Sequence, residues 1–366
     1  MKRLLLAIII NMFLFSANFA CAMEEPCSSQ EHQGRISKAP TWEFLKEGDG
    51  VEIIAPSGAP VSLRQINEIY SLITTHGLAP FLREGAIDKA ASRHDYYANS
   101  DKERTRCFIE ALQGPSKVLW ALRGGFGAIE VVELLERSAI SPPEHPKLII
   151  GFSDITALHL LAATWGWPSL HGPVIGLGEE LYRVTQANVN KSTKLSSVFS
   201  TLKGEVGELE HTFNVVYPGS LTLEMPILGS VVGGNLSIIE NHKGTPTALQ
   251  GKGRFVFFED TPEDAKRFSR RLVGLVHAGV FDKAKGIIVG NNPITGFEDS
   301  SQKTIDEISY FIKNFLLPRK IDIPVIYSPR FGHGEFNDVM PLGTAASLNI
   351  LGEQAILRVS VNESAY

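Results

Sequence analysis

The stretch LIIGFSDITALHLL places a serine, Ser153, between an apolar run and a helical pattern. A hydroxyl at such a turn projects from the edge of a sheet, and the free amides of the following helix N-terminus can stabilise a developing oxyanion. Serine is equally common there as a simple helix cap. The GxSxG motif of α/β-hydrolases is absent, because Ile155 replaces its second glycine. The local sequence leaves both roles open, nucleophile and cap.

A glycine-rich loop, RGGFG at 123–127, follows another apolar run. Adjacent glycines let a backbone approach a ligand closely, so amides of this loop are candidates to complete an oxyanion hole. The loop lacks the P-loop lysine and the full dinucleotide glycine pattern. A plain tight turn is the alternative.

A serine nucleophile needs a base, and the chain has ten histidines. His171 and His333 stand in glycine-bordered loops, whereas His159 lies in a helical pattern that favours a core or solvated role. Sequence spacing cannot select among them, because the members of a catalytic triad meet only in the fold.

Two acids, Glu259 and Asp260, follow an apolar strand pattern. Strand alternation predicts that one points inward and the other toward solvent, and an inward carboxylate could orient an imidazole. The alternative is that both merely precede a helix. His333 with Glu335 hints at a metal pair, but no HExxH motif or cysteine pair accompanies them, so we predict neither metal nor other cofactor.

The elements that must position these residues alternate along the first half of the chain. We expect strands at 51–55, 78–81, 117–122 and 148–152, with helices at 61–76, 100–113, 129–135 and 154–165. Alternating strands and helices predict an α/β fold with a parallel sheet covered on both faces. Function gathers beyond the carboxyl ends of such strands, where RGGFG and GFSD both lie.

The second half has a different pattern. Residues 181–225 are weakly patterned and are predicted to be a connector, and a second unit is expected over 226–366. Its strand at 253–260 leads to Thr261 and Pro262, which we expect to cap and open the next helix. Short β-like runs at 323–327 and 346–359 close the chain.

The N-terminus predicts export. Two basic residues, an apolar run at 4–15 and the small-x-small pattern Ala20-Cys21-Ala22 are typical of a signal peptide over 1–22. The run is short for a membrane span, and lipidation of Cys21 is a lesser alternative. A flexible lead-in at 23–46 then precedes an N-terminal domain at 47–180.

Composition narrows the class of protein. The chain has 366 residues, 43% of them hydrophobic, and a net charge of −5, which argues against a nucleic-acid binder. Cleavage after residue 22 would leave Cys27 and Cys107, too few for a disulfide-framed fold. Their pairing is left open, and Cys107 is expected in the core of its helix.

Together these motifs resemble the LD-carboxypeptidases, enzymes that trim a terminal D-amino acid from cell-wall peptides. The matching stretches, in the family's order, are IIAPSG (53–58), WALRGGFG (120–127), IIGFSDITALH (149–159), LHGP (170–173), GGNLSIIENHKGTP (233–246), FFED (257–260) and PRFGHGEFNDVMPLG (329–343).

The resemblance implies a Ser-His-Glu triad. Ser153 is then the nucleophile, His333 the base and Glu259 the carboxylate that orients it. The implied oxyanion hole consists of the Asp154 amide and the amide of Gly124 or Gly125. Because the family's order along the chain is Ser, Glu, His, it disfavours His171 and His159 as the base.

The resemblance also implies a Rossmann-like N-terminal domain, a smaller β-rich C-terminal domain and a homodimer, with the site between the domains. The implied substrate is a murein tetrapeptide, and the export signal suggests action in the periplasm. Arg123 is a candidate for binding the substrate's free carboxylate. Alternatives are a microcin-C immunity-type peptidase and an inactive murein-peptide binding protein.

Overall fold

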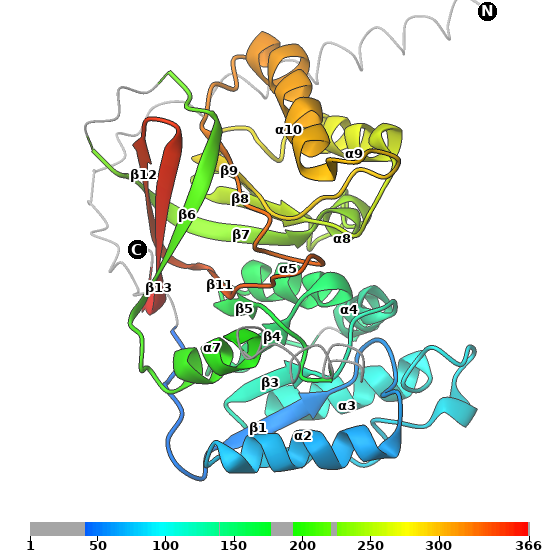
Figure 1. Cartoon of the computed structure of the whole chain (residues 1–366). Coiled ribbons are helices and arrows are strands. Elements are labelled where there is room, and N and C mark those ends of the chain that lie inside the picture. Colours follow the sequence, from blue (N-terminus) through cyan, green and yellow to red (C-terminus); the bar gives the residue numbers. More distant parts are fainter. Residues whose placement is uncertain (1–40, 139, 177–192, 221–224, 365–366) are drawn as a thin grey trace, which may run out of the picture. The chain divides into compact units, whose positions relative to one another are not determined.

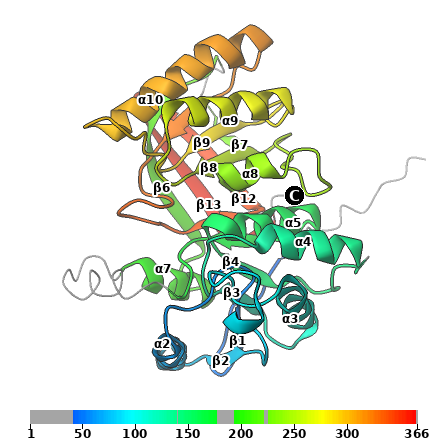
Figure 2. The same cartoon turned by 90° about the vertical axis from the view of Figure 1, so that its right-hand side faces the viewer.

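The computed structural model describes residues 41–138, 140–176, 193–220 and 225–364, and they contain two sheets. The first sheet has the strand order β11-β5-β4-β3-β1-β2 (Figures 1 and 2). Its strands are β1 (Gly50–Ile54), β2 (Ala79–Leu82), β3 (Val118–Ala121), β4 (Leu148–Gly151), β5 (Ser169–His171) and β11 (Met340–Leu342). β1 to β5 pair in parallel, and β11 is antiparallel to β5.

Helices cover both faces of this sheet (Figure 2). They are α2 (Leu63–Thr75), α3 (Asp101–Gln113), α4 (Ala128–Arg137), α5 (Thr156–Thr164) and α7 (Thr193–Leu202). Alternate residues of β3 explain the two layers, because successive strand side chains point to opposite faces. Trp120 packs in a cluster with Ile73 of α2, whereas Leu119 packs with Phe108 of α3 and Val131 of α4.

The second sheet is a closed barrel in the order β10-β6-β13-β12-β7-β8-β9. Its strands are β6 (Glu208–Tyr217), β7 (Ile227–Asn235), β8 (Phe255–Glu259), β9 (Gly286–Val289), β10 (Val325–Tyr327), β12 (Thr344–Leu351) and β13 (Gln354–Ser364). The helices between its parallel strands are α8 (Leu236–Asn241), α9 (Ala265–His277) and α10 (Ser300–Phe311). Short helical turns are η1 (Lys89–Ala91), η2 (Ser153–Ile155), η4 (Ile312–Leu316) and η5 (Leu317–Arg319).

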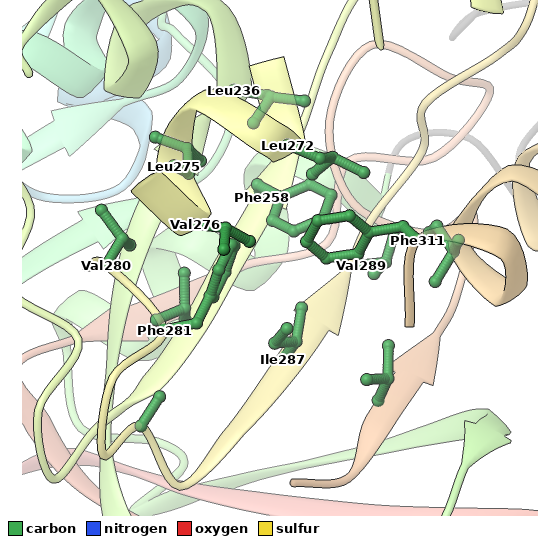
Figure 3. Close-up of a cluster of buried hydrophobic side chains, with 14 of the residues drawn as sticks. Leu236, Phe258, Leu272, Leu275, Val276, Val280, Phe281, Ile287, Val289 and Phe311 are labelled. Atoms are coloured by element: carbon green, nitrogen blue, oxygen red, sulfur yellow. The ribbon is translucent and has the colours of Figure 1, made fainter. Parts of the chain in front are cut away.

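Burial of apolar side chains holds α9 and α10 against the barrel strands. Phe258 and Val289 of β8 and β9 face Leu272 of α9 and Phe311 of α10 (Figure 3). Each fully buried side chain of this size contributes roughly 1.5–3 kcal/mol. The fold class is therefore confirmed as α/β, with a Rossmann-like parallel-sheet part and a β-rich C-terminal part.

Contacts of β11 and of β7 join the first sheet and its helices to the barrel. β11 comes from the last fifth of the chain, yet it extends the first sheet by pairing Met340 with His171. Gly234, near the end of β7, packs against the first residue of α5: a Cβ at Gly234 would lie 2.4 Å from Thr156 Oγ1. The next amide, of Asn235, donates to the same hydroxyl at 2.8 Å. The barrel is thereby fixed to the helix that follows Ser153.

The helix after β8 begins later than its sequence predicts. The cap predicted at Thr261 and Pro262 is wrong, because α9 begins after Asp264, whose carboxylate accepts from the amides of Lys266 and Arg267. Threonine and aspartate are both favoured N-cap residues, so the local pattern alone does not choose between them.

The segment expected as a connector, 181–225, contains α7 and the long barrel strand β6, while residues 177–192 and 221–224 lie outside the described part. The domain limits themselves stay a prediction. Cys107 is buried as a free thiol on α3, as expected of a core residue. Cys21, Cys27 and the predicted signal peptide lie outside the described residues. No helix in the described ranges is long and apolar enough to cross a membrane.

Candidate active site

Ser153 occupies a strained turn between β4 and α5. Its φ is 61°, a left-handed conformation that non-glycine residues rarely adopt and that stores roughly 1–3 kcal/mol. The side chain does not cap a helix: η2 follows Phe152 and α5 follows Ile155, and neither has a side-chain cap bond. The alternative role of Ser153 as a helix cap is therefore wrong.

The structure brings Ser153 to His333 and Glu259. Nε2 of His333 lies 3.0 Å from Ser153 Oγ, and Nδ1 of His333 lies 2.7 Å from Glu259 Oε2. Ser153 comes from the first sheet, Glu259 ends barrel strand β8, and His333 lies in the loop before β11. A hydroxyl, an imidazole and a carboxylate thus form one continuous hydrogen-bonded chain, which is the geometry of a catalytic triad.

Glu259 is fully buried and ionised. Burial by itself would raise its pKa, but the nearby His333 and His171 outweigh burial and lower the pKa to about 2. Glycines leave room for the carboxylate. A Cβ at Gly332, where φ is 100°, would stand 2.2 Å from Glu259 Oε2, and one at Gly290 would stand 2.9 Å from Glu259 Cβ.

The contact between Glu259 and His333 also changes the pKa of His333. Burial lowers the pKa of the imidazole, but the charge and hydrogen bond of Glu259 raise it, and the net effect is a raised pKa. The ring of Phe152 packs against His333 with a centroid distance of 4.8 Å. His333 is therefore oriented from both sides and made a stronger base than a free histidine.

The RGGFG loop lies directly against Ser153. A Cβ at Gly124 would be 3.0 Å from Ser153 Cβ and 3.6 Å from the Asp154 amide, so a side chain there would crowd the hydroxyl. The Gly124 carbonyl accepts from the Gly58 amide at 3.1 Å. Within the described residues, neither Gly124 nor Gly125 donates its own amide to a hydrogen bond. These amides remain available for an oxyanion.

The side chain of Asp154 ties three loops together. Its buried Oδ2 accepts from Ser57 Oγ at 2.6 Å and from the Ala128 amide at 2.8 Å. Ser57 follows β1, and Ala128 opens α4 immediately after RGGFG. Arg104 reinforces the same loops by donating to the carbonyls of Pro56 and Gly127. The sequence singled out only the Asp154 amide, because no local pattern indicates this tertiary role of its carboxylate.

Arg123 is exposed at the start of the loop, and its Nη1 donates to the Ala59 carbonyl at 3.1 Å. That bond uses one of the five donors of a guanidinium.

The two remaining candidate histidines are both buried. His159 bonds Ser169 Oγ at 3.0 Å and the Gly151 carbonyl at 2.9 Å, and burial lowers its pKa to about 3. His159 therefore has a core role, which is one of the two roles expected of it. His171 lies behind Glu259, with Nε2 at 3.7 Å from Oε1. Neither ring contacts Ser153 through a hydrogen bond in the described part of the chain.

The expectation that one of Glu259 and Asp260 faces solvent is wrong, because both are buried. Asp260 lies just beyond the end of β8, so strand alternation no longer applies, and it is 2% exposed. Its carboxylate accepts from Ser237 Oγ at 2.6 Å and from Asn235 Nδ2 at 3.0 Å. The same side-chain nitrogen, Asn235 Nδ2, also donates to Glu259 Oε1 at 3.4 Å. No local pattern predicted that Asn235 and Ser237 would bind these acids. The GGNLS stretch was noted only as one of the stretches that resemble the family.

No group of three or more histidine, cysteine, aspartate or glutamate side chains is placed to hold a metal ion within the described residues.

Comparison with known proteins agrees with this geometry. Residues 51–172 match the LD-carboxypeptidase N-terminal domain, and residues 228–348 match the LD-carboxypeptidase C-terminal domain. A predicted carboxypeptidase of Rickettsia conorii is 33% identical over 262 residues, which is 71% of this chain and 76% of that protein. The murein tetrapeptide carboxypeptidase of Pseudomonas aeruginosa is 26% identical over 86% of this chain and 97% of its own length.

Solved structures show the same fold. A muramoyltetrapeptide carboxypeptidase from Oxalobacter formigenes aligns with a TM-score of 0.64 at 24% identity, over 85% of this chain and 98% of that one. An MccF-like protein from Bacillus anthracis aligns with a TM-score of 0.70 at 21% identity, over 87% and 98%. The fold and these matches define a serine carboxypeptidase. The chain belongs to the LD-carboxypeptidase family.

Proposed function

We propose that the protein hydrolyses the amide between an L-centre and a terminal D-amino acid of murein peptides, converting a tetrapeptide to a tripeptide and D-alanine. Its relatives include a murein tetrapeptide carboxypeptidase. The observation that supports the chemistry best is the chain of hydrogen bonds from Ser153 through His333 to Glu259.

In the proposed reaction, His333 Nε2 takes the proton of Ser153 while Oγ attacks the carbonyl carbon of the terminal amide. The imidazolium that forms is stabilised by the Glu259 carboxylate, which accepts from Nδ1. His333 then gives the proton to the leaving amine, and D-alanine departs. Water, activated by the same imidazole, releases the tripeptide from the acyl-enzyme.

The negative charge that develops on the carbonyl oxygen needs fixed donors. We assign this role to the Asp154 amide and to the amide of Gly124 or Gly125. A Cβ at Gly124 would lie 3.3 Å from Ser153 Oγ and 3.6 Å from the Asp154 amide, so this loop is close to both groups. Removing a single oxyanion donor typically lowers kcat by about 10²- to 10³-fold.

Arg123 is proposed to bind the free carboxylate of the substrate, because it begins the loop that borders Ser153 and retains unused donors. Arg123→Ala should then raise KM for tetrapeptide with little change in kcat. An unchanged KM would remove Arg123 from the site.

Export to the periplasm and assembly as a homodimer are also proposed, from the N-terminal pattern and the family resemblance respectively. Mass spectrometry of secreted protein should find a mature N-terminus after Ala22, and light scattering should give twice the monomer mass. A retained N-terminus or a monomer would refute the respective proposal.

The decisive experiment incubates the purified protein with murein tetrapeptides that contain either lysine or meso-diaminopimelate, and scores released D-alanine by mass. A tetrapeptide ending in L-alanine is the stereochemical control. Ser153→Ala should bind tetrapeptide without cleaving it. Wild-type protein that binds the peptides but leaves all of them intact would instead favour the inactive binding protein. A chelator should leave the rate unchanged.

The microcin-C immunity-type alternative would use the same three residues on an aminoacyl-adenylate mimic. The discriminating feature is an aromatic side chain in 176–225 that can stack on adenine, and 177–192 of that stretch lie outside the described residues. Including an aminoacyl sulfamoyl adenosine in the same panel separates the two activities. Cleavage of that compound with no release of D-alanine would replace our proposal.

A further inference from the structure

His171 is a buried histidine without a hydrogen-bond partner. It ends β5, its side chain is fully buried, and neither Nδ1 nor Nε2 is hydrogen-bonded to any described group. Buried side-chain nitrogens are nearly always paired in native proteins, so an unpaired imidazole calls for a functional explanation. The contrast with His159 is direct, because both ring nitrogens of His159 are bonded.

The ring of His171 lies next to the carboxylate of the triad. Nε2 lies 3.7 Å from Glu259 Oε1. Apolar rings make up much of the rest of the pocket, with Phe257 perpendicular to His171 at a centroid distance of 5.0 Å and Phe152 at 6.2 Å. The other titratable groups near this pair are His159, whose centroid is 6.2 Å from His171, and His333 and Asp260 beyond Glu259.

Glu259 has one well-bonded oxygen and one poorly bonded oxygen. Oε2 accepts from His333 at 2.7 Å, whereas the hydrogen bond that Oε1 accepts from the described residues is the long contact of 3.4 Å from Asn235 Nδ2. An ionised carboxylate can accept several hydrogen bonds, and a fully buried one depends on protein donors for them. His171 Nε2, at 3.7 Å, is a further potential donor to Oε1.

On the basis of the proposed function, we propose that His171 is a positioning residue of the triad, whose imidazole donates Nε2–H to Glu259 Oε1 in the reacting enzyme. A charge-assisted bond of ordinary length needs the two groups to approach by about 1 Å. The bond holds the carboxylate so that Oε2 stays on Nδ1 of His333. His171 itself touches neither the serine nor the substrate.

Loss of this donor has two separable consequences. The carboxylate stays paired with His333 but is held less precisely, which lowers kcat by about 10- to 100-fold, the effect of one hydrogen bond to a charged group. The remaining anion is also less stabilised, so the pair formed by Glu259 and His333 binds a proton more readily. The acid limb of the pH profile therefore moves to higher pH.

The test compares His171→Phe, which removes the donor, with His171→Gln, which keeps an N–H donor at similar reach. His159→Gln is the matched control, because it alters a buried histidine of the same core that does not face Glu259. Rates of D-alanine release are measured from pH 5 to 9 and divided by the number of active sites titrated with diisopropyl fluorophosphate. The pH dependence of that labelling is measured as well.

His171→Phe should lower kcat for D-alanine release, with KM nearly unchanged. It should also move two acid limbs to higher pH, that of D-alanine release and that of labelling. His171→Gln should restore both limbs toward wild type. His159→Gln should lower the melting temperature without moving either limb. Unshifted limbs in His171→Phe, or an equal shift in His159→Gln, would overturn the proposal. If His171→Phe fails to fold, His171→Leu is used in its place.

Labelling separates this inference from the proposed substrate. Wild-type protein that is labelled at Ser153 but releases no D-alanine refutes the murein activity, and the labelling profile still decides the role of His171. Absence of labelling at Ser153 refutes the serine mechanism and the positioning role together.

Discussion

Gly332 is the residue whose replacement tests the triad most sharply without removing any of its members. A Cβ at this position would stand 2.2 Å from Glu259 Oε2 and 2.7 Å from both Cβ and Cδ of Glu259. The clash involves the whole acidic side chain, so a change of rotamer cannot relieve it. In Gly332→Ala, the carboxylate must retreat by about 1 Å to reach an ordinary contact distance.

The size of the effect follows from that displacement. A retreat of about 1 Å lengthens the 2.7 Å bond to His333 beyond hydrogen-bonding range. Misplacement of this size typically lowers the rate by about 10²-fold, or ~2.7 kcal/mol in the activation free energy. An upper limit is the ~10⁴-fold loss that follows when a triad carboxylate is replaced by an amide.

Backbone strain is a second effect and needs its own control. Alanine at the Gly332 φ of 100° should lower the free energy of unfolding by about 1–2 kcal/mol. Gly296 has a comparable φ of 86° and nothing within 4 Å of its hypothetical Cβ. Gly296→Ala should therefore lose similar stability while keeping full kcat/KM.

The assay measures kcat/KM for D-alanine release and the free energy of urea unfolding for both variants. The reasoning is refuted if folded Gly332→Ala stays within about threefold of wild type in kcat/KM. It is equally refuted if Gly296→Ala loses as much activity as Gly332→Ala.

Three further outcomes are expected. The acid limb of kcat/KM should lie above pH 6.5, because Glu259 raises the pKa of His333, and Glu259→Gln should move that limb to lower pH; a limb that stays in place contradicts the pairing. Because the pKa of Glu259 falls from 4.5 to about 2 on folding, its ionisation stabilises the fold above pH 4.5, and this contribution is lost as pH falls toward 2. Urea unfolding from pH 6 to 3 should accordingly show a smaller loss of unfolding free energy in Glu259→Gln than in wild type. An equal loss in both proteins would contradict the lowered pKa of Glu259. Ser57→Ala removes the 2.6 Å bond to buried Asp154 and should lower the free energy of unfolding by about 1–3 kcal/mol; the exposed Ser138→Ala should change it little, and equal effects would contradict a special role for Ser57.

The sequence predicted the parallel sheet well because its strands are short apolar runs with clear breaks. Observed β1, β3 and β4 lie within or one residue beside the expected runs, and α3 begins after the predicted cap, Ser100. Strand β6 was missed because one face of it is mostly half-buried and the other face carries mostly polar, exposed side chains, so its alternation is weak. The start of α9 was misplaced because threonine, proline and aspartate all suit a helix N-terminus, and only packing chooses among them.

The sequence by itself determined which residue types were available: a serine after a buried strand, glycines able to lie against it, and acids at the end of another strand. Only the tertiary structure decided that Ser153, His333 and Glu259 meet, because they are separated by up to 180 residues and no local pattern encodes their distance. It also decided the strained φ of Ser153, the bridge made by the Asp154 carboxylate and the burial of His171 behind Glu259. The physical reason is that local propensity fixes each element, whereas the packing of one sheet against the other fixes where side chains from distant elements lie.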